Sequence, residues 1–224
     1  MRRALLVLFL AGLSTVGALA GARAARTDTS LLSATVGTND AYKISFVDAS
    51  SAAVTHATPG TFTIDVKDDS AIHNLHLVGP GVDKATTIPG TGETSWTVTL
   101  QNGYYRFYCD PHLASMHGAF TVGNGRLPLT ASVASKGVLT VKDAFEFSPA
   151  KLTEGAYTVT VHDRSAKDNF RLTGPGVNRA TGIAFRGTAR WTVTLGPGTY
   201  TFRSDSHRAR RHTLRVSGVP SWGP

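Results

Sequence analysis

The feature that most constrains the fold is an internal repeat with an offset of 95 residues. The segment LVGPGVDKAT at 77–86 returns as LTGPGVNRAT at 172–181, and WTVTL occurs at both 96–100 and 191–195. The two copies align without a gap over about 48–123. A duplication of this length predicts two similar domains in tandem, with the junction just after the first copy ends.

Each copy shows the alternation of apolar and polar residues that is typical of half-buried β-strands. Apolar Phe, Ile and Val alternate with Thr and Asp over 62–66, and a similar alternation occurs over 157–161. Gly-Pro-Gly at 79–81 and at 174–176 breaks the chain between strands. The sequence therefore predicts an all-β fold of two tandem Greek-key β-sandwich domains.

The N-terminus has the pattern of a secretory signal peptide. Arg2 and Arg3 precede an apolar run that ends at Ala20, and small residues follow. An uncleaved anchor is the alternative, but the run includes Gly, Ser and Thr and, at about 17 residues, is near the lower limit for crossing a membrane. We expect cleavage after Ala20 or Ala24, no stable membrane span afterwards, and export to the periplasm, the cell envelope or the exterior.

These observations divide the chain into three parts: a signal peptide over 1–24, a first domain over 25–125, and a second domain over 126–224 that ends in a short C-terminal tail. The formal net charge of +8 falls to about +5 once the signal is removed. This modest charge does not predict nucleic-acid binding. The single cysteine excludes an internal disulfide framework, a thiolate-held iron–sulfur cluster and an all-cysteine zinc site.

The cysteine lies in a segment that is rich in metal ligands. Cys109 is followed by His112 and Met116, and the intervening Asp-Pro pair favours a turn that brings His112 back toward the sulfur. Upstream, His73 begins a predicted strand over 73–77. A lone cysteine is often only a small buried hydrophobe. Together with two imidazoles and a thioether, however, it suits copper in both oxidation states, and Cys-His-His with a weak axial Met is the blue-copper arrangement.

On these residues the first copy resembles the cupredoxins, the group of plastocyanin, azurin and amicyanin. The resemblance implies a copper site with His73, Cys109, His112 and Met116 as ligands. It also implies that Asn74, the partner of His73 in the shared His-Asn pair, braces the two ligand loops. The electron would leave through His112, the ligand that lies nearest the loop surface in this family.

Two neighbouring histidines are not expected to be ligands. His76 has the opposite strand parity from His73, which predicts that it faces away from the site. His117 recurs as His212 in the second copy, which favours a role in packing or at the surface.

The second copy keeps the scaffold and loses most of the ligands, so we expect one copper per chain. Only His112 keeps a histidine, His207, at the same offset. Serine and arginine cannot replace the thiolate and the thioether for copper. The residues that stand in place of His73, Cys109 and Met116 are Asp168, Ser204 and Arg211.

The loop that carries these replacements is strongly basic, with Arg208, Arg210 and Arg211 close together. One interpretation is a solvated loop in which arginine serves solubility. The other is docking to an acidic redox partner protein or to an anionic envelope surface, where charge speeds encounter.

The leading functional prediction is an exported carrier of single electrons that is not an enzyme. The alternative is a copper-binding or delivery protein without redox turnover. An oxidase or nitrite reductase would need further histidines, and Cys109 is flanked by Tyr108 and Asp110 rather than by the histidines that connect a blue site to a trinuclear cluster. A structural or adhesive module with incidental copper is the fourth class.

Overall fold

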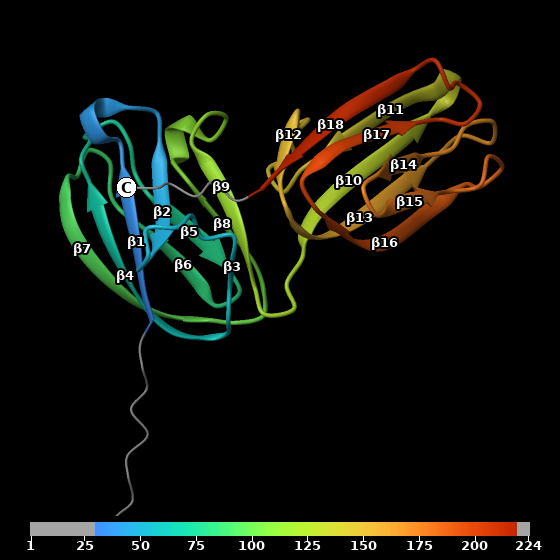
Figure 1. The fold of residues 1–224 in the computed structure, drawn as a ribbon. Coiled ribbons are helices and arrows are strands. Elements are labelled where there is room, and N and C mark those ends of the chain that lie inside the picture. The colour runs from blue at the N-terminus through green and yellow to red at the C-terminus, as the bar shows by residue number, and fades with distance from the viewer. Residues whose placement is uncertain (1–29, 219–224) are drawn as a thin grey trace, which may run out of the picture.

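The computed structural model describes residues 30–218, and the predicted signal peptide lies outside this range. Within it, eighteen strands form two pairs of sheets, one pair after the other along the chain (Figure 1). The predicted all-β class and the tandem sandwich arrangement are confirmed. Three short 3-10 turns are the remaining regular elements of the described range, and no helix there is long and apolar enough to span a membrane.

The first domain consists of a four-stranded sheet and a five-stranded sheet. The first has the order β2-β1-β4-β7 and the second the order β3-β9-β8-β5-β6. The pairs β1–β4 and β3–β9 are parallel, and the remaining pairs are antiparallel. The bounds are β1 (Ser30–Val36), β2 (Ile44–Asp48), β3 (His56–Ala57), β4 (Gly60–Asp68), β5 (His76–Gly79), β6 (Val82–Ala85), β7 (Gly92–Leu100), β8 (Gly103–Tyr108) and β9 (His117–Val122), with short turns η1 (Thr38–Asp40) and η2 (Asp110–His112).

The second domain repeats this topology. Its sheets have the orders β11-β10-β13-β16 and β12-β18-β17-β14-β15, with β10–β13 and β12–β18 as the parallel pairs. The bounds are β10 (Leu127–Ala134), β11 (Val138–Lys142), β12 (Lys151–Thr153), β13 (Gly155–Asp163), β14 (Arg171–Gly174), β15 (Val177–Ala180), β16 (Gly187–Leu195), β17 (Gly198–Arg203) and β18 (Arg211–Ser217), with the turn η3 (Ser135–Gly137).

The duplication is visible strand by strand. Strands β4 to β8 have counterparts in β13 to β17 that each begin and end 95 residues later. The domains differ most at the connection between their first two strands. This connection has seven residues, 37–43, in the first domain and three residues, 135–137, in the second. The shorter connection changes the end of the second sandwich that corresponds to the metal site of the first.

Alternating burial gives each sandwich its own core. In β4, Phe62, Ile64 and Val66 are buried in the first core while their polar neighbours face outward. In β13, Tyr157, Val159 and Val161 are buried in the second core in the same way. The predicted alternation is therefore confirmed, and apolar burial of this kind is the main stabilising term for such a fold.

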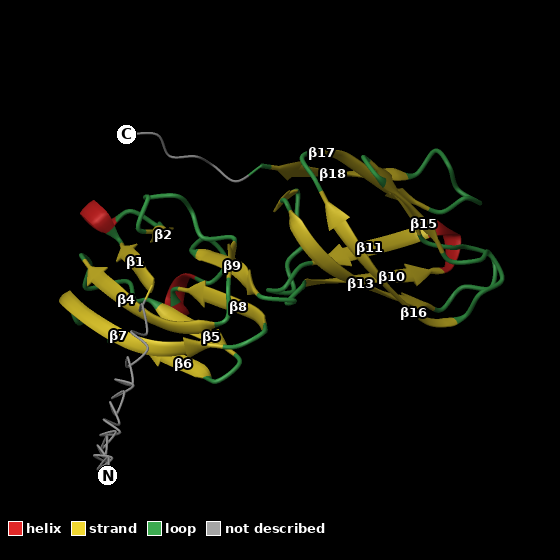
Figure 2. Cartoon of the chain, turned by 60° about the horizontal axis from the view of Figure 1, so that its bottom comes forward, coloured by secondary structure: helices red, strands yellow, loops and turns green. Residues whose placement is uncertain are grey.

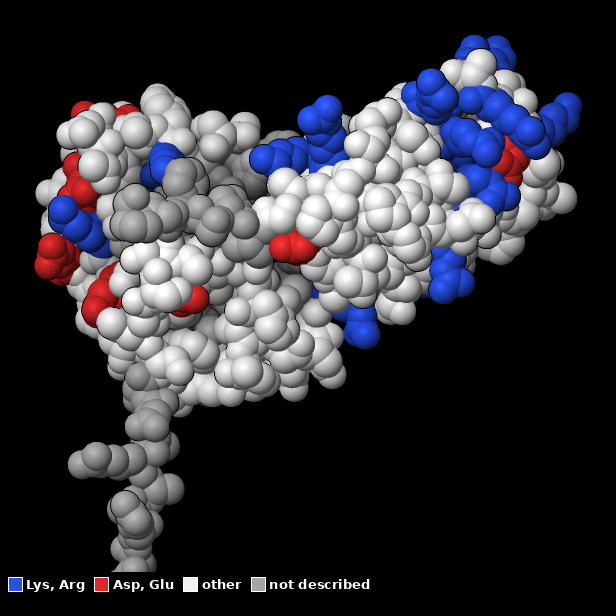
Figure 3. Space-filling model, viewed as in Figure 1, with Lys and Arg blue, Asp and Glu red and all other residues white. Residues whose placement is uncertain are grey.

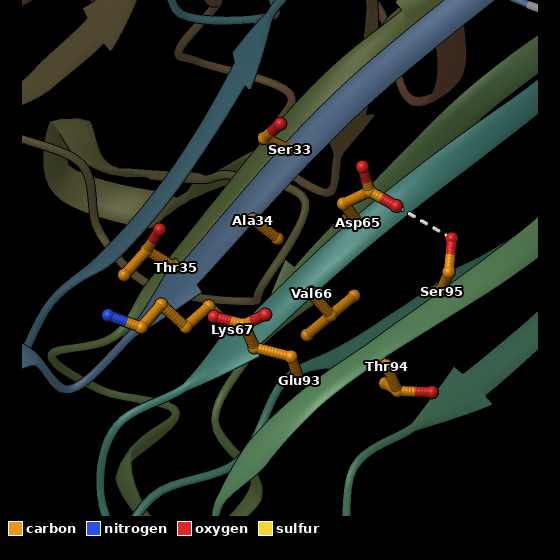
Figure 4. A pocket seen from close by; sticks show the side chains of 9 residues that line it. All are labelled: Ser33, Ala34, Thr35, Asp65, Val66, Lys67, Glu93, Thr94 and Ser95. Atoms are coloured by element: carbon orange, nitrogen blue, oxygen red, sulfur yellow. Dashed lines mark hydrogen bonds between the residues drawn. The ribbon is translucent and has the colours of Figure 1, made fainter.

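The outer face of the sheet β2-β1-β4-β7 carries the polar half of this alternation. Its side chains border a shallow hollow of about 580 Å³ (Figure 4). The Ser95 hydroxyl of β7 donates to Asp65 Oδ1 of β4 at 2.6 Å, which links two strands across the face. These are the outward residues expected of strands that bury one side only.

The second domain contacts the first through the segment that connects β11 to β12. Arg106 of β8 donates to the carbonyl oxygen of Ala144 at 3.4 Å, and its guanidinium lies 5.7 Å from the centre of the Phe145 ring. The Phe145 ring also packs on His117 of β9, with ring centroids 4.5 Å apart. These contacts join the second domain to strands β8 and β9, which flank the Cys109 loop.

One carboxylate ties two segments of the second domain together. Asp205, just after β17, accepts hydrogen bonds from Arg171 Nε at 2.8 Å, Arg203 Nη1 at 2.7 Å and Asn169 Nδ2 at 3.0 Å. The bond from Arg171 is the main reason that the pKa of Asp205 lies well below its usual range, because a cationic donor stabilises the ionised carboxylate.

We expect Asp205→Asn to lower the free energy of unfolding by about 1–3 kcal/mol at pH 7, since it weakens bonds to charged donors. The pKa of Asp205 is lower in the folded state than its unfolded value of about 3.9, so its contribution is complete above that value and is lost as the pH falls through the folded pKa. Denaturant unfolding across a pH series should show the gap between wild type and variant narrowing from pH 4 to pH 2. A constant gap over this range would contradict the assignment.

Candidate metal site

Three side chains from two stretches of the first domain bring their ligand atoms together. The Nδ1 atoms of His73 and His112 lie 2.9 Å apart, and Cys109 Sγ lies 3.7 Å from the former and 3.4 Å from the latter. Among the described residues this is the one group of three or more His, Cys, Asp or Glu side chains whose ligand atoms converge in this way. His73 and Cys109 are fully buried, and His112 is half-buried.

The donor set fits a soft metal ion. Metal–nitrogen and metal–sulfur bonds of about 2.0–2.3 Å would reach all three atoms from one point between them. Burial raises the pKa of the Cys109 thiol, so the thiolate needs a positive charge beside it. One thiolate with two imidazoles suits copper in both oxidation states.

The sulfur and the second histidine are fixed by a tight loop between β8 and β9. The His112 amide donates to the Cys109 carbonyl at 3.1 Å, and the Met116 amide donates to the His112 carbonyl at 2.8 Å. The Cys109 amide in turn donates to the Met116 carbonyl at 3.0 Å, which closes the loop. Met116 is buried in the same core as Cys109. The backbone therefore brings the predicted axial ligand back to the cysteine.

His73 lies in the connection between β4 and β5, and the strand predicted over 73–77 is wrong at its start. Strand β5 begins only at His76. The reason is visible at Leu75, whose amide donates to the Thr86 hydroxyl at 2.9 Å instead of joining a strand ladder. His73, Leu75 and Leu77 are nevertheless all buried, as their shared parity predicted.

The β1–β2 connection fixes the orientation of His73. The His73 Nε2 atom lies 3.4 Å from the Asp40 carbonyl oxygen, which can only accept, so Nε2 carries the proton and Nδ1 keeps its lone pair for a metal. Gly37, with φ of 63°, lies directly behind the ring, and an added Cβ would be 2.8 Å from His73 Cδ2. Tyr42 packs edge-on against both imidazoles, with ring centroids 4.9 Å from His73 and 4.7 Å from His112.

Asn74 joins the two ligand loops, as the family resemblance implies. Its Nδ2 donates to Asp110 Oδ2 at 2.7 Å, and the Asp110 amide donates to Asn74 Oδ1 at 2.8 Å. His76 faces away from the three ligand atoms, yet its Nδ1 donates to Asp110 Oδ1 at 2.9 Å. Although burial opposes ionisation, the bonds from His76 and Asn74 hold the pKa of Asp110 below its usual value. Asp110 is thus a fixed anionic anchor beside Cys109.

Asp110 and Tyr42 were not predicted to be part of the site, and only Asp110 has a sequence pattern that could have indicated it. Asn74 and Asp110 both recur in the second copy, as Asn169 and Asp205. The second copy keeps this pair without the metal ligands, which indicates that the two residues make a structural contact. Tyr42 lies outside the aligned copies, and only the folded structure shows that it covers the histidines.

The surface next to His112 is small and mostly apolar. Leu113 is half-buried, and Ala114 and Tyr42 are exposed. His117 does not join the ligand atoms; its Nδ1 donates to the Leu113 carbonyl at 2.7 Å, and its ring packs on Phe145. It therefore has a packing position at the base of the ligand loop.

In the second domain the corresponding positions hold a carboxylate–imidazole hydrogen bond instead of a ligand set. His207 Nδ1 lies 2.6 Å from Asp168 Oδ1, and the Ser204 hydroxyl donates to the same oxygen at 3.2 Å. The last ligand position is Arg211, an exposed residue at the start of β18. The three arginines considered for docking, Arg208, Arg210 and Arg211, are all exposed on this domain.

The comparisons with known proteins agree with this chemistry. Residues 40–123 match the family model described as copper binding proteins, plastocyanin/azurin family. The search of curated proteins finds no match to the chain.

Solved copper proteins resemble the chain weakly over most of its length. A multicopper oxidase is 11% identical at a TM-score of 0.33, covering 84% of this chain and 88% of that one. A copper nitrite reductase from Nitrosomonas europaea is also 11% identical at a TM-score of 0.33, covering 84% of this chain and 93% of that one. The laccase-like multicopper oxidase CueO from the bacterium Ochrobactrum sp. is 13% identical at a TM-score of 0.35. The match covers 87% of this chain and 62% of that one.

The repeat provides a matched test of the Asn74 brace. We expect Asn74→Ala to weaken copper binding about 10–100-fold, because the two ligand loops lose their connection. Asn169→Ala removes the equivalent side chain from the second domain and should leave copper affinity unchanged. Competition titration with a copper chelator measures both. Equal affinities for wild type and Asn74→Ala would show that the brace does not hold the ligands.

Proposed function

We propose that this protein is an exported carrier of single electrons, since residues 40–123 match the family model of the copper-binding plastocyanin/azurin proteins. The convergence of His73 Nδ1, Cys109 Sγ and His112 Nδ1 is the observation that carries the proposal. We assign these residues as ligands, with Met116 as the weak fourth ligand. Bound there, copper supplies a one-electron couple between Cu(I) and Cu(II).

The protein's contribution is to hold the ligands still. His73 is fixed from behind by the Asp40 carbonyl and the close approach of Gly37. Cys109 and Met116 are fixed by the backbone bonds of their loop. Because the sandwich resists rearrangement, the same ligand positions serve both oxidation states, which keeps reorganisation small.

His112 is the proposed exit for the electron. It is the one half-buried residue of the three convergent ligands, and apolar Leu113 and Ala114 follow it directly. A partner that contacts this patch would come within reach of a ligand ring while water is excluded from the contact.

Burial of the ligands favours an electron carrier over copper delivery. Transfer of the ion to another protein requires exchange of ligands, and His73, Cys109 and Met116 are closed to solvent. An electron needs only a surface ligand. We also propose a non-enzymatic role, because Cys109 is flanked by Tyr108 and Asp110 rather than by the histidines that connect a blue site to a trinuclear cluster.

The proposed redox partner contacts the first domain. Arg208, Arg210 and Arg211 lie on the second domain, whose outer end is remote from the first in Figure 1. In this proposal they attract an acidic partner to the second domain, and this attraction is largely screened beyond about 10 Å at ordinary salt, short of the His112 surface. The export signal proposed for residues 1–24 fits this role in the periplasm, the cell envelope or the exterior.

The decisive experiment is a spectrum and a voltammogram of the copper-loaded mature protein. We expect one copper per chain, intense absorption near 600 nm from the thiolate, and a reversible one-electron wave. Cys109→Ser should abolish the colour and the wave, whereas Ser204→Ala at the equivalent position should change neither.

Other outcomes would reject the proposal. Two tightly bound coppers per chain would contradict the assignment of a single site. Rapid loss of Cu(I) to a chelator without a reversible wave would favour delivery, and oxygen consumption with a phenolic donor would indicate an oxidase.

A further inference from the structure

The two domains have opposite charge. Residues 30–125 contain four Lys or Arg and eight Asp or Glu. Residues 126–224 contain fifteen Lys or Arg and six Asp or Glu. Figure 3 shows basic side chains gathered over the outer end of the second domain, while most of the acidic ones in this view lie on the first. A net positive charge that is concentrated at one end indicates an anionic ligand or surface there.

A pocket lies at the end of the second sandwich that corresponds to the metal site of the first. It has a volume of about 560 Å³, within the range of about 300–1,000 Å³ that is usual for small-molecule sites. Four basic residues line it: Lys136, Arg164, Lys167 and Arg186. Asp168 and His207, which replace two of the copper ligands, also line it.

The short β10–β11 connection leaves this pocket open. In the first domain the longer connection places Tyr42 against both histidines. In the second, the three-residue turn η3, seen at the outer end of the domain in Figure 2, carries no such ring. Its Gly137, with φ of 68°, lies so close to His207 that an added Cβ would be 2.7 Å from the imidazole. His207 is thus held by the turn yet keeps 38% of its side chain exposed.

The four basic side chains of the pocket have no acidic partner. Within residues 30–218, the ion pairs closer than 4 Å involve none of Lys136, Arg164, Lys167 and Arg186. These exposed side chains line one pocket without a paired carboxylate, and an anion bound among them would gain favourable charge interactions with them.

The one acidic residue that lines the pocket, Asp168, is buried, and its carboxylate oxygens accept hydrogen bonds from within the domain. It is 1% exposed, and its oxygens accept from Ser165 at 2.9 Å, Ser204 at 3.2 Å and His207 at 2.6 Å. Its role is to orient His207 at the floor of the pocket. The positive rim remains available to a ligand.

We propose that this end of the second domain is a binding pocket for a phosphate-class oxyanion, which is held by Arg164, Arg186, Lys136 and Lys167 beside His207. Guanidinium groups bind phosphate through paired, charge-assisted hydrogen bonds, and lysine adds a point charge. The phosphate group can belong to a free anion or to an anionic lipid headgroup, since the chemistry of recognition is the same.

The test is titration with inorganic phosphate, followed by calorimetry, at constant ionic strength set with chloride. We expect saturable binding that weakens about tenfold or more in Arg164→Gln/Arg186→Gln, since the charged bonds lost together contribute at least about 1.4 kcal/mol. Arg179→Gln/Arg190→Gln removes two exposed arginines from the same domain outside the pocket and should change affinity less than about threefold. Circular dichroism checks that all variants are folded.

A second arm identifies the source of the phosphate. Vesicles of phosphatidylglycerol in phosphatidylcholine are compared with phosphatidylcholine alone in a sedimentation assay. Stronger loss of vesicle binding in the pocket variant than in the control variant supports the pocket with a lipid headgroup as its ligand. Equal loss in both variants, or no saturable binding of phosphate or vesicles, would overturn the proposal. The basic residues would then act only through nonspecific attraction of anions to the net positive charge of the domain.

This inference stands apart from electron transfer. Both arms are repeated on Cys109→Ser, which lacks the proposed copper ligand, and binding should be unchanged. Failure of the copper site would therefore leave the anion result intact, and failure of anion binding would leave the copper site intact.

Discussion

The pair of hydrogen bonds between an asparagine and an aspartate is the contact on which both ends of this molecule depend. Asn74 joins Asp110 in the first domain, and Asn169 joins Asp205 in the same way in the second. In each case the amide side chain satisfies a backbone amide of the opposite loop and so holds the two loops at a fixed separation. Because the second domain keeps this contact without the metal ligands, the scaffold does not need an ion to form.

What lies between the braced loops decides the chemistry of each domain. In the first, two imidazole nitrogens and a sulfur face one another, with no carboxylate among the convergent atoms. In the second, Asp168 stands where His73 stood and pairs directly with His207. A carboxylate that hydrogen-bonds an imidazole leaves no open set of metal ligands, whereas converging lone pairs of nitrogen and sulfur can bind a cation. Three substitutions, to Asp168, Ser204 and Arg211, therefore remove the metal-ligand set.

The change of charge and the change of loop length act together. Shortening the first connection from seven residues to three removes the position of Tyr42, and basic residues then surround the space that is left. The first domain carries an excess of acidic residues and the second an excess of basic ones. Duplication has thus given one chain a buried donor set at one site and a positive pocket at the other, on the same strand framework.

The repeat of 95 residues and the alternation within it determined the strands from β4 to β8, their copies, the all-β class and the clustering of Cys109, His112 and Met116 in one loop. These follow from local spacing, which a sequence carries directly. The start of β5, the packing of Tyr42 on both histidines and the anchoring of Asp110 by His76 were decided only by the tertiary structure. They depend on which distant segments meet, and a contact such as Leu75 with Thr86 competes with strand pairing in a way that no local pattern records.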